Sequence, residues 1–509
     1  MVTKDMKKVL IMGCHPLADS LKRQYRALGC EVATAPFEAP AAGQDMLATA
    51  VASDELVLLS DSAATDGAMV AWMGVLADAL AATPRKQRLL CHLLVQQTDV
   101  LRMLQTTDFC EAVRHYVDVY PFGMDEVWSH SIVLDREPIT LQSDRHVHLV
   151  VFGMDEVGEQ VALAAARTAH YPNYTRDHSL RTRITMVDER PQAHEPLLER
   201  YAQLFDNSYY RVVKPGAERC IDRLHKPRYE GQREDFVDVE WEFVEAAVGQ
   251  QELWAKLRLW AKDERQLLTL VFAYTDQQRN LAAALLLPDV VGRNGIGVYV
   301  YCHEPLGLAQ WPALRAFGMP DRGYDVTLPY VSMAKTVNYV YDQCYNDNEA
   351  NWTGRLRYAV EIDREKRETL WLDLTAVKRQ SNILNAMTIA TKMRSVGLEP
   401  DDWEHFYDLS EQDIELLAQV EHNRWSVEEL SLGWRPCTPA EQAAIEADIA
   451  QKEELKALKV HYDLRAYADL RRDITGKPVA MYDRCLSACL PLIAKAFADE
   501  RPNRKGGGQ

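Results

Sequence analysis

The sequence is poor in the features that mark membrane, secreted and metal-binding proteins. No run of about 18 or more apolar residues occurs, so we expect no transmembrane helix. The apolar run at residues 9–12 is too short for a signal-peptide core, and we therefore expect a cytoplasmic protein. The ten cysteines form no C-x-x-C pair, which predicts reduced thiols that serve as small core residues.

Basic residues are also in deficit. Lys and Arg total 58 against 75 Asp and Glu, which gives a formal net charge of −17. This charge predicts no binding to nucleic acid or to an anionic membrane surface, because the protein repels phosphate polyanions. The other proportions, 47% hydrophobic and 26% charged residues, are those of a globular protein and exclude intrinsic disorder. At about 150 residues per domain, the chain length predicts three or four domains.

Motifs for common catalytic and metal chemistry are absent as well. The sequence has neither a G-x-x-x-x-G-K-[ST] phosphate loop nor a G-x-S-x-G nucleophile elbow. His146 and His148 alternate along an expected strand, but no third metal ligand is apparent. We therefore predict no metal site and assign no catalytic residue. The sequence favours a protein that is not an enzyme, although active sites also assemble from distant residues.

Two stretches that alternate apolar strands with amphipathic helices make up most of the chain. Residues 1–135 carry strand signals at 9–12, 31–35, 56–60 and 89–95, with helical periodicity between them. The pattern restarts at His146 and covers residues 140–345. This alternation predicts parallel sheets covered by helices. The predicted fold class is α/β, with two tandem Rossmann-like domains followed by a small, mainly α-helical domain.

A strand-to-helix turn in the second domain carries part of the dinucleotide-binding fingerprint. Gly153 and Gly158 match the first and third glycines of G-x-G-x-x-G. Asp188 ends the next expected strand, where an acid binds the cofactor ribose. These three residues are the candidate cofactor-binding residues.

Two acidic residues weaken this fingerprint. Asp155 replaces the middle glycine, where a carboxylate opposes a pyrophosphate, and Glu156 adds negative charge at the helix N-terminus. Two interpretations stay open: a domain that binds NAD(P), and a Rossmann scaffold that has lost its cofactor. The first domain keeps only Gly13 of the motif, so we expect it to serve in packing.

The stretches 150–164, 184–189 and 274–281 together resemble the TrkA-N domain, a nucleotide-binding Rossmann module that regulates potassium channels and transporters. The resemblance covers residues from about 140 to about 320. It implies a Rossmann fold, with a nucleotide or NAD(P) as the cofactor that such a domain would bind.

Helical periodicity dominates the rest of the chain. We assign residues 346–400 to a helical linker, 401–495 to a helical domain and 496–509 to a flexible tail. The helical domain resembles the ryanodine-receptor (RyR) repeat domain of bacterial proteins, with its pattern H-x-x-W, G-W and K-x-H-x-x-L-x-x-Y-x-x-L. The matching residues are His422, Trp425, Gly433, Trp434, Lys459, His461, Leu464, Tyr467 and Leu470.

The residues of the RyR-like segment suit a flat, charged ligand. His422 and Trp425 lie three residues apart and so share a helix face. Indole, imidazole and basic side chains can together bind a nucleobase and a phosphate. The candidate ligand-binding residues are His422, Arg424, Trp425, Trp434, Lys459, His461 and Tyr467. The alternative interpretation is that the tryptophan and histidine side chains belong to the core.

The RyR resemblance implies a sensor of nucleotide-derived ligands, with a role in a stress or anti-phage defence system. We therefore predict a regulatory protein that binds a nucleotide-like small molecule through its RyR-like domain. Its partner would be a protein effector or a second copy of the chain. The alternatives are an NAD(P)-dependent oxidoreductase that uses Gly153, Gly158 and Asp188, and an interaction scaffold without a ligand.

Overall fold

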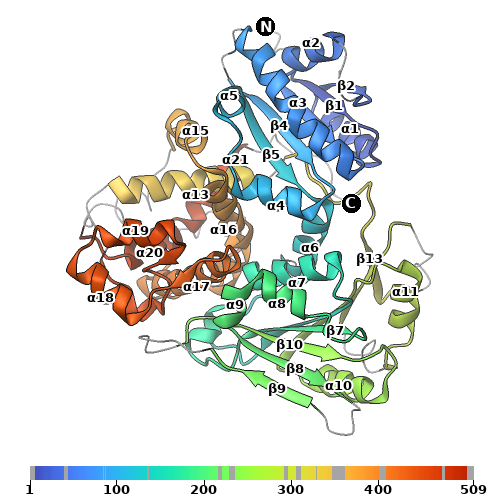
Figure 1. Ribbon diagram of the computed structural model, residues 1–509, viewed down its shortest axis with the longest axis vertical. Coiled ribbons are helices and arrows are strands. Elements are labelled where there is room, and N and C mark those ends of the chain that lie inside the picture. The colour runs from blue at the N-terminus through green and yellow to red at the C-terminus, as the bar shows by residue number, and fades with distance from the viewer. Residues whose placement is uncertain are drawn as a thin grey trace.

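The structure is a computed structural model in which two sheets and a helical body are arranged around a common junction (Figure 1). It describes residues 6–38, 44–83, 85, 87–134, 137–215, 221–227, 235–289, 291, 296–304, 311–327, 329–346, 362–400, 409–472 and 476–500. We expected a flexible tail at residues 496–509. The part of it beyond position 500 lies outside the described residues.

The first sheet, sheet A, confirms the parallel α/β architecture expected of the N-terminal part. Its strands β1 (Lys8–Met12), β2 (Glu31–Ala35), β3 (Glu55–Leu59), β4 (Leu89–Leu94) and β5 (Val117–Phe122) pair in the order β2-β1-β3-β4-β5, all parallel. The central strand β3 is buried along its whole length, as its apolar sequence predicts. The helices of this part are α1 (Leu17–Ala27), α2 (Gln44–Ala52), α3 (Ala63–Ala81), α4 (Thr98–Thr106) and α5 (Glu111–Tyr116).

The second sheet, sheet B, has eight strands and contains a Rossmann core. Its order is β13-β12-β11-β6-β7-β10-β8-β9. The strands are β6 (His146–Phe152), β7 (Thr182–Asp188), β8 (Tyr209–Lys214), β9 (Ile221–His225), β10 (Val239–Glu245), β11 (Gln266–Phe272), β12 (Gly297–Tyr301) and β13 (Leu314–Phe317). The six strands from β13 to β10 are parallel and follow the 3-2-1-4-5-6 order of dinucleotide-binding folds. The β6–β11 pair is therefore the topological switch point.

The outer strands of sheet B extend this core. β8 pairs in parallel with β10, and β9 closes the edge as an antiparallel partner of β8. The helices around the sheet are α7 (Glu156–Thr168), the 3-10 turn η1 (Pro172–Thr175), α8 (Glu195–Arg200), α9 (Ala202–Asp206), α10 (Gln251–Lys262) and α11 (Gln277–Leu285).

The helical body follows sheet B. It contains α13 (Pro329–Asn346), α15 (Arg364–Leu372), α16 (Ala376–Ser395), α17 (Glu411–Ser431), α18 (Pro439–Ala447), α19 (Gln451–Ala457), η4 (Tyr467–Asp469), α20 (Ala480–Ala488) and α21 (Leu490–Glu500). One short parallel pair, β14 (Arg435–Pro436) with β15 (Val460–His461), interrupts the helices. A capping box fixes the start of α17, because the Ser410 hydroxyl accepts from the Asp413 amide while Asp413 reaches back to Ser410.

The boundaries of the helical body differ from the sequence-based division. α13 lies within the stretch predicted for the second Rossmann domain, but it packs against α15, α16, α20 and α21. α16 lies within the expected linker, yet its apolar face shares a core with α13, as Val337 and Ile389 show. α16 buries polar as well as apolar residues, and only the long-range contacts of both helices reveal which body they join.

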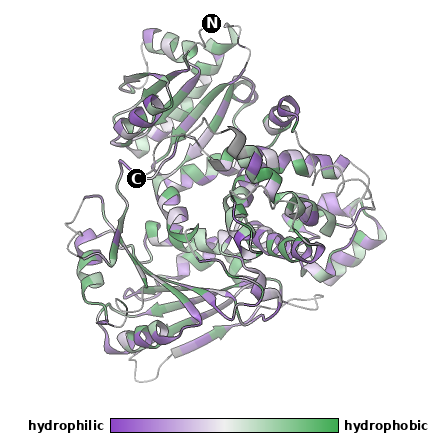
Figure 2. Cartoon of the chain, turned by 180° about the vertical axis from the view of Figure 1, so that it is seen from behind, coloured by the Kyte–Doolittle hydropathy of each residue, from purple (hydrophilic) through white to green (hydrophobic). Residues whose placement is uncertain are grey.

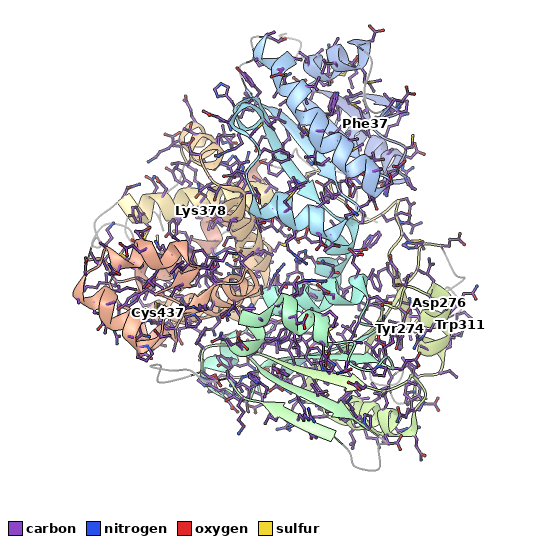
Figure 3. All side chains as sticks on the ribbon, viewed as in Figure 1. Phe37, Tyr274, Asp276, Trp311, Lys378 and Cys437 are labelled. Atoms are coloured by element: carbon purple, nitrogen blue, oxygen red, sulfur yellow. The ribbon has the colours of Figure 1, made fainter. Side chains whose placement is uncertain are left out.

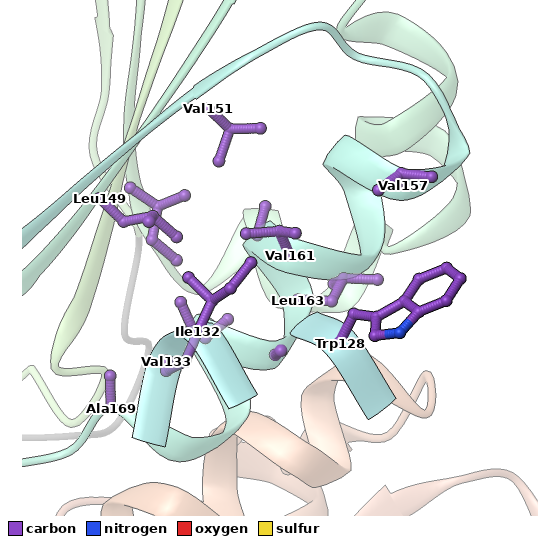
Figure 4. Close-up of a cluster of buried hydrophobic side chains, with 14 of the residues drawn as sticks. Trp128, Ile132, Val133, Leu149, Val151, Val157, Val161, Leu163 and Ala169 are labelled. Carbon is purple, nitrogen blue, oxygen red and sulfur yellow. The ribbon is translucent and has the colours of Figure 1, made fainter. Parts of the chain in front are cut away.

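A helix from the N-terminal part connects the two α/β units. α6 (Met124–Leu134) follows β5 but packs against α7 of the second unit. Its Trp128, Ile132 and Val133 join Leu149 and Val161 in one buried cluster (Figure 4). Hydrophobic residues also concentrate along the strands of both sheets (Figure 2). The two units therefore share one core rather than meeting through a flexible linker.

No helix in the described ranges is both long enough and apolar enough to cross a bilayer.

Candidate functional site

The glycine turn after β6 forms as the fingerprint predicts. Gly153 has φ +101°, and a Cβ there would lie 2.9 Å from the Tyr274 amide nitrogen. A Cβ on Gly158 would lie 2.1 Å from the Gly153 carbonyl oxygen, so this glycine lets α7 approach the turn. Both close approaches are to the backbone of the protein itself. They explain the two glycines without any ligand.

An arginine that the sequence reasoning missed neutralises the acids beside this turn. Arg190 Nε and Nη2 donate to the two oxygens of Asp188 at 2.9 and 2.7 Å, and Nη2 lies 2.8 Å from Asp155. The Met154 amide also donates to Asp188. Burial alone would raise the pKa of Asp188, but these hydrogen bonds outweigh it and lower the pKa. The candidate ribose-binding acid is thus already engaged. The only sign of this ion pair in the sequence was that Arg190 follows Asp188 by two positions.

A cleft of about 830 Å³, the interdomain cleft, opens beside the glycine turn. One wall comes from the loop after β4 and the start of α4, the other from the glycine turn, the start of α7 and the segment after β7. It is lined by Gln96, Gln97, Thr98, Asp99, Met154, Asp155, Glu156, Glu159, Met186, Arg190, Pro191, Ala193, Pro196, Leu197 and Arg200. Ligands of α/β proteins bind at this edge, outside the carboxyl ends of the strands.

The structure brings five of the seven RyR-like candidates together as an aromatic cluster. Each ring neighbours the next. The ring centroid of His422 lies 5.8 Å from that of Tyr467 and 5.6 Å from that of Trp425. The ring centroid of His461 lies 4.9 Å from that of Trp425 and 5.6 Å from that of Trp434. Trp425 and Trp434 both meet His461 nearly perpendicularly. Both tryptophans are half-buried and pack against the core that α17 shares with the second α/β unit, which leaves part of each residue accessible.

Protein groups already engage the histidines of this cluster. His422 is buried; its Nε2 donates to the Arg465 carbonyl at 2.8 Å and its Nδ1 lies 3.4 Å from Asp483. Burial lowers the pKa of His461 to about 4, so its imidazole is neutral at pH 7. His422 is therefore a buried positioning residue in the aromatic cluster, and His461 supplies a neutral polar ring.

A carboxyl that the sequence reasoning missed lies beside Trp425. Burial raises the pKa of Glu429 to about 8, and the charge of Glu428 adds to this effect. Glu429 also has a hydrogen bond with Trp425, four residues earlier on α17. At pH 7 this carboxyl is protonated and can donate as well as accept a hydrogen bond.

The other two candidates lie outside the aromatic cluster. Arg424 is 1% exposed; it donates to Glu421 at 2.9 Å and to Glu428 at 2.8 Å. Lys392 also pairs with Glu421, and these four residues form the buried ion cluster. Lys459 is exposed and donates to the Leu432 carbonyl at 2.9 Å, close to the turn that presents Trp434.

Of the two alternating histidines of β6, His148 is held by hydrogen bonds within the protein. His148 is buried between the Gln266 amide oxygen at 2.6 Å and the Thr185 hydroxyl at 2.8 Å. Across the ranges that the structure describes, no group of three His, Cys, Asp or Glu side chains is arranged to hold a metal ion.

Comparison with known proteins identifies no relative: no protein-family model matches the chain, and no curated protein matches it.

Proposed function

We propose that the protein is a regulatory sensor that binds a nucleotide-derived small molecule at the aromatic cluster. The observation that carries this proposal is the pair of half-buried tryptophans, Trp425 and Trp434, which flank the neutral imidazole of His461. Any nucleobase can stack on an accessible indole ring.

The polar groups around the tryptophans complement a base and a phosphate. The protonated Glu429 and the neutral His461 offer hydrogen bonds to the edge of a base without an electrostatic penalty. Lys459, exposed near the same turn, supplies a positive charge for a phosphate. Each of these groups belongs to the helical body, so the site is complete without the Rossmann turn.

Ligand binding at the aromatic cluster can influence the rest of the protein through α17. This helix packs against α7, η1 and α9 of the second α/β unit. Its Val427 and Leu430 belong to the same core as Val161 of α7. A ligand that prefers one position of α17 would therefore shift the packing of the helix that follows the glycine turn.

The geometry is less favourable to the oxidoreductase alternative. Asp188 is held by Arg190 and by the Met154 amide, and Asp155 accepts hydrogen bonds from the Thr275 amide and hydroxyl. A dinucleotide would have to replace these bonds and also approach Glu156. We keep this alternative, and that of a scaffold without a ligand, as outcomes of the test below.

The proposal is tested by mass spectrometry of small molecules released from the purified protein, followed by titration with ATP, AMP, cyclic nucleotides and NAD. We expect one nucleotide to raise the melting temperature of the wild type. Trp434→Ala should weaken its affinity about tenfold or more, since base stacking contributes about 1–3 kcal/mol.

Trp311→Ala is the matched control, because Trp311 is 38% exposed and lies beside sheet B, away from the helical body that carries Cys437 (Figure 3). It should bind the nucleotide as the wild type does. Binding of NAD alone that Trp434→Ala does not change would support the oxidoreductase instead. No response to any nucleotide would favour the scaffold.

A further inference from the structure

The interdomain cleft has the size and the walls of a ligand site. Its volume of about 830 Å³ is within the range of small-molecule pockets. Apolar side chains that include Met154, Met186 and Leu197 form part of the lining, and the polar remainder comes from both α/β units. A ligand in the cleft would therefore contact both α/β units.

Hydrogen bonds to buried groups fix the loop after β4, which forms the wall from the first unit. Buried Asp66 on α3 accepts hydrogen bonds from the backbone amides of Gln96 and Gln97, at 2.9–3.1 Å. The Gln96 side chain donates to the Ser60 carbonyl at 2.7 Å. The loop after β4 is thus fixed before any ligand arrives, which reduces the entropy that binding costs.

The charges in the cleft are unequal. Four carboxylates line it, from Asp99, Asp155, Glu156 and Glu159, but only two guanidiniums, from Arg190 and Arg200. A third arginine, Arg102, lies outside the lining; it pairs with Asp99 at 3.2 Å and lies 3.9 Å from Glu159. Both guanidiniums are already paired: Arg190 with Asp155 and Asp188, and Arg200 with Glu159 at 2.6 and 2.7 Å.

Glu156 carries the uncompensated charge. Within the described ranges, no Lys, Arg or His lies within ion-pairing distance of it, and its hydrogen bond comes from the Thr98 hydroxyl across the cleft. Burial raises the pKa of the neighbouring Asp125 to about 6, and the charge of Glu156 contributes to this rise. As the first residue of α7, Glu156 also stands where a Rossmann domain places a phosphate. A phosphate in this cleft would meet a carboxylate.

We infer that the interdomain cleft binds an organic cation with one or more amino groups, held by Glu156 and by Asp99 at the opposite wall. The amino groups would supply the positive charge that the lining lacks, and the methylene segments of the ligand would lie along the apolar side chains. This inference does not depend on the aromatic cluster, because none of the cleft residues belongs to it.

Spermidine is the probe for this inference, measured by isothermal titration calorimetry on the full chain. We expect saturable binding to the wild type that weakens about tenfold in Glu156→Gln, as expected for the loss of a charge-assisted contact. Glutamine keeps an acceptor for Thr98, so the folded structure should persist. Asp99→Asn is the second variant. Asp99 pairs with Arg102 at 3.2 Å, but its side chain is 86% exposed, so an amino group can replace the guanidinium and the variant should weaken binding as well.

Two controls separate specific binding from general attraction by a chain of net charge −17. Glu252→Gln removes an exposed acid from the first turn of α10, away from the cleft lining, and should leave the affinity unchanged. Trp434→Ala should also leave it unchanged, which keeps this test separate from that of the aromatic cluster. The inference is overturned by equal weakening in Glu252→Gln, by absence of spermidine binding, or by ATP or NAD binding that tightens in Glu156→Gln.

Discussion

Two groups of ion pairs lie close to the residues that the sequence singles out, and burial distinguishes them. In the buried ion cluster, Arg424 is 1% exposed and its partners Glu421 and Glu428 are equally enclosed. In the interdomain cleft, the Arg190 side chain is 54% exposed although it too pairs with two carboxylates. The first group cannot exchange its partners without unfolding the helical body. The exposed Arg190 guanidinium can exchange its partners with water or a ligand, as a binding surface requires.

The largest effect that tests this comparison is expected from removing one arginine of each group. Arg424→Met should lower the free energy of unfolding by about 3–5 kcal/mol, because it leaves Glu428 buried without a counter-charge and Glu421 with Lys392 alone. Arg190→Met should cost less, about 1–2 kcal/mol, because the buried Asp188 keeps its hydrogen bonds from the Met154 and Arg190 amides. Urea denaturation of both variants measures the difference. Equal losses would show that the cleft is as rigidly held as the helical core.

A smaller effect is expected from the backbone of the cleft, which the comparison predicts to be rigid although its side chains are exchangeable. Gly158→Ala places a Cβ 2.1 Å from the Gly153 carbonyl oxygen and should cost about 1–3 kcal/mol. Gly74→Ala, inside α3 with no atom within 4 Å of the added Cβ, should be neutral or stabilising. Thermal unfolding without any nucleotide compares them. If Gly158→Ala keeps full stability and loses only ligand affinity, the glycine is there for a ligand.

The sequence predicted local structure well where one residue type dominates a segment. The strand expected from His146 onward is β6, and the Gly153 turn follows it as expected, because an apolar run and a glycine with positive φ act locally. β8 and β9 were missed, since their polar and apolar residues mix. The order of the parallel strands could not be predicted, because each pairing depends on crossovers between distant segments.

The sequence predicted the sites less well, because side-chain burial and contacts depend on how distant segments pack together. His422 and Trp425 share a helix face, so their contact followed from their spacing. Arg424 was assigned to the ligand, although acids three residues before and four residues after it already indicated ion pairs along α17. Arg190 and Glu429 were missed, because what matters about them is burial and the approach of residues from other elements.

The smallest expected effect on stability comes from Glu429. It tests whether the aromatic cluster contains an uncharged carboxyl, in contrast to the charged groups of the buried ion cluster on the same helix, α17. Its pKa of about 8 in the folded protein lies above the value of an unperturbed glutamate. The unfolded chain therefore releases this proton at lower pH than the folded protein does. The resulting stabilisation is complete below about pH 4.5 and is lost as the pH rises to about 8.

Glu429→Gln removes this titration while keeping the shape and the hydrogen-bonding capacity of the side chain. Relative to the variant, the wild type should lose at least about 1 kcal/mol of unfolding free energy between pH 5 and pH 8. Urea denaturation across this range measures the slope, and Glu252→Gln, which alters an exposed acid on α10, should keep the slope of the wild type. Parallel curves for the wild type and Glu429→Gln would mean that Glu429 is already ionised at neutral pH. The aromatic cluster would then present a carboxylate and disfavour an anionic ligand, as the interdomain cleft does.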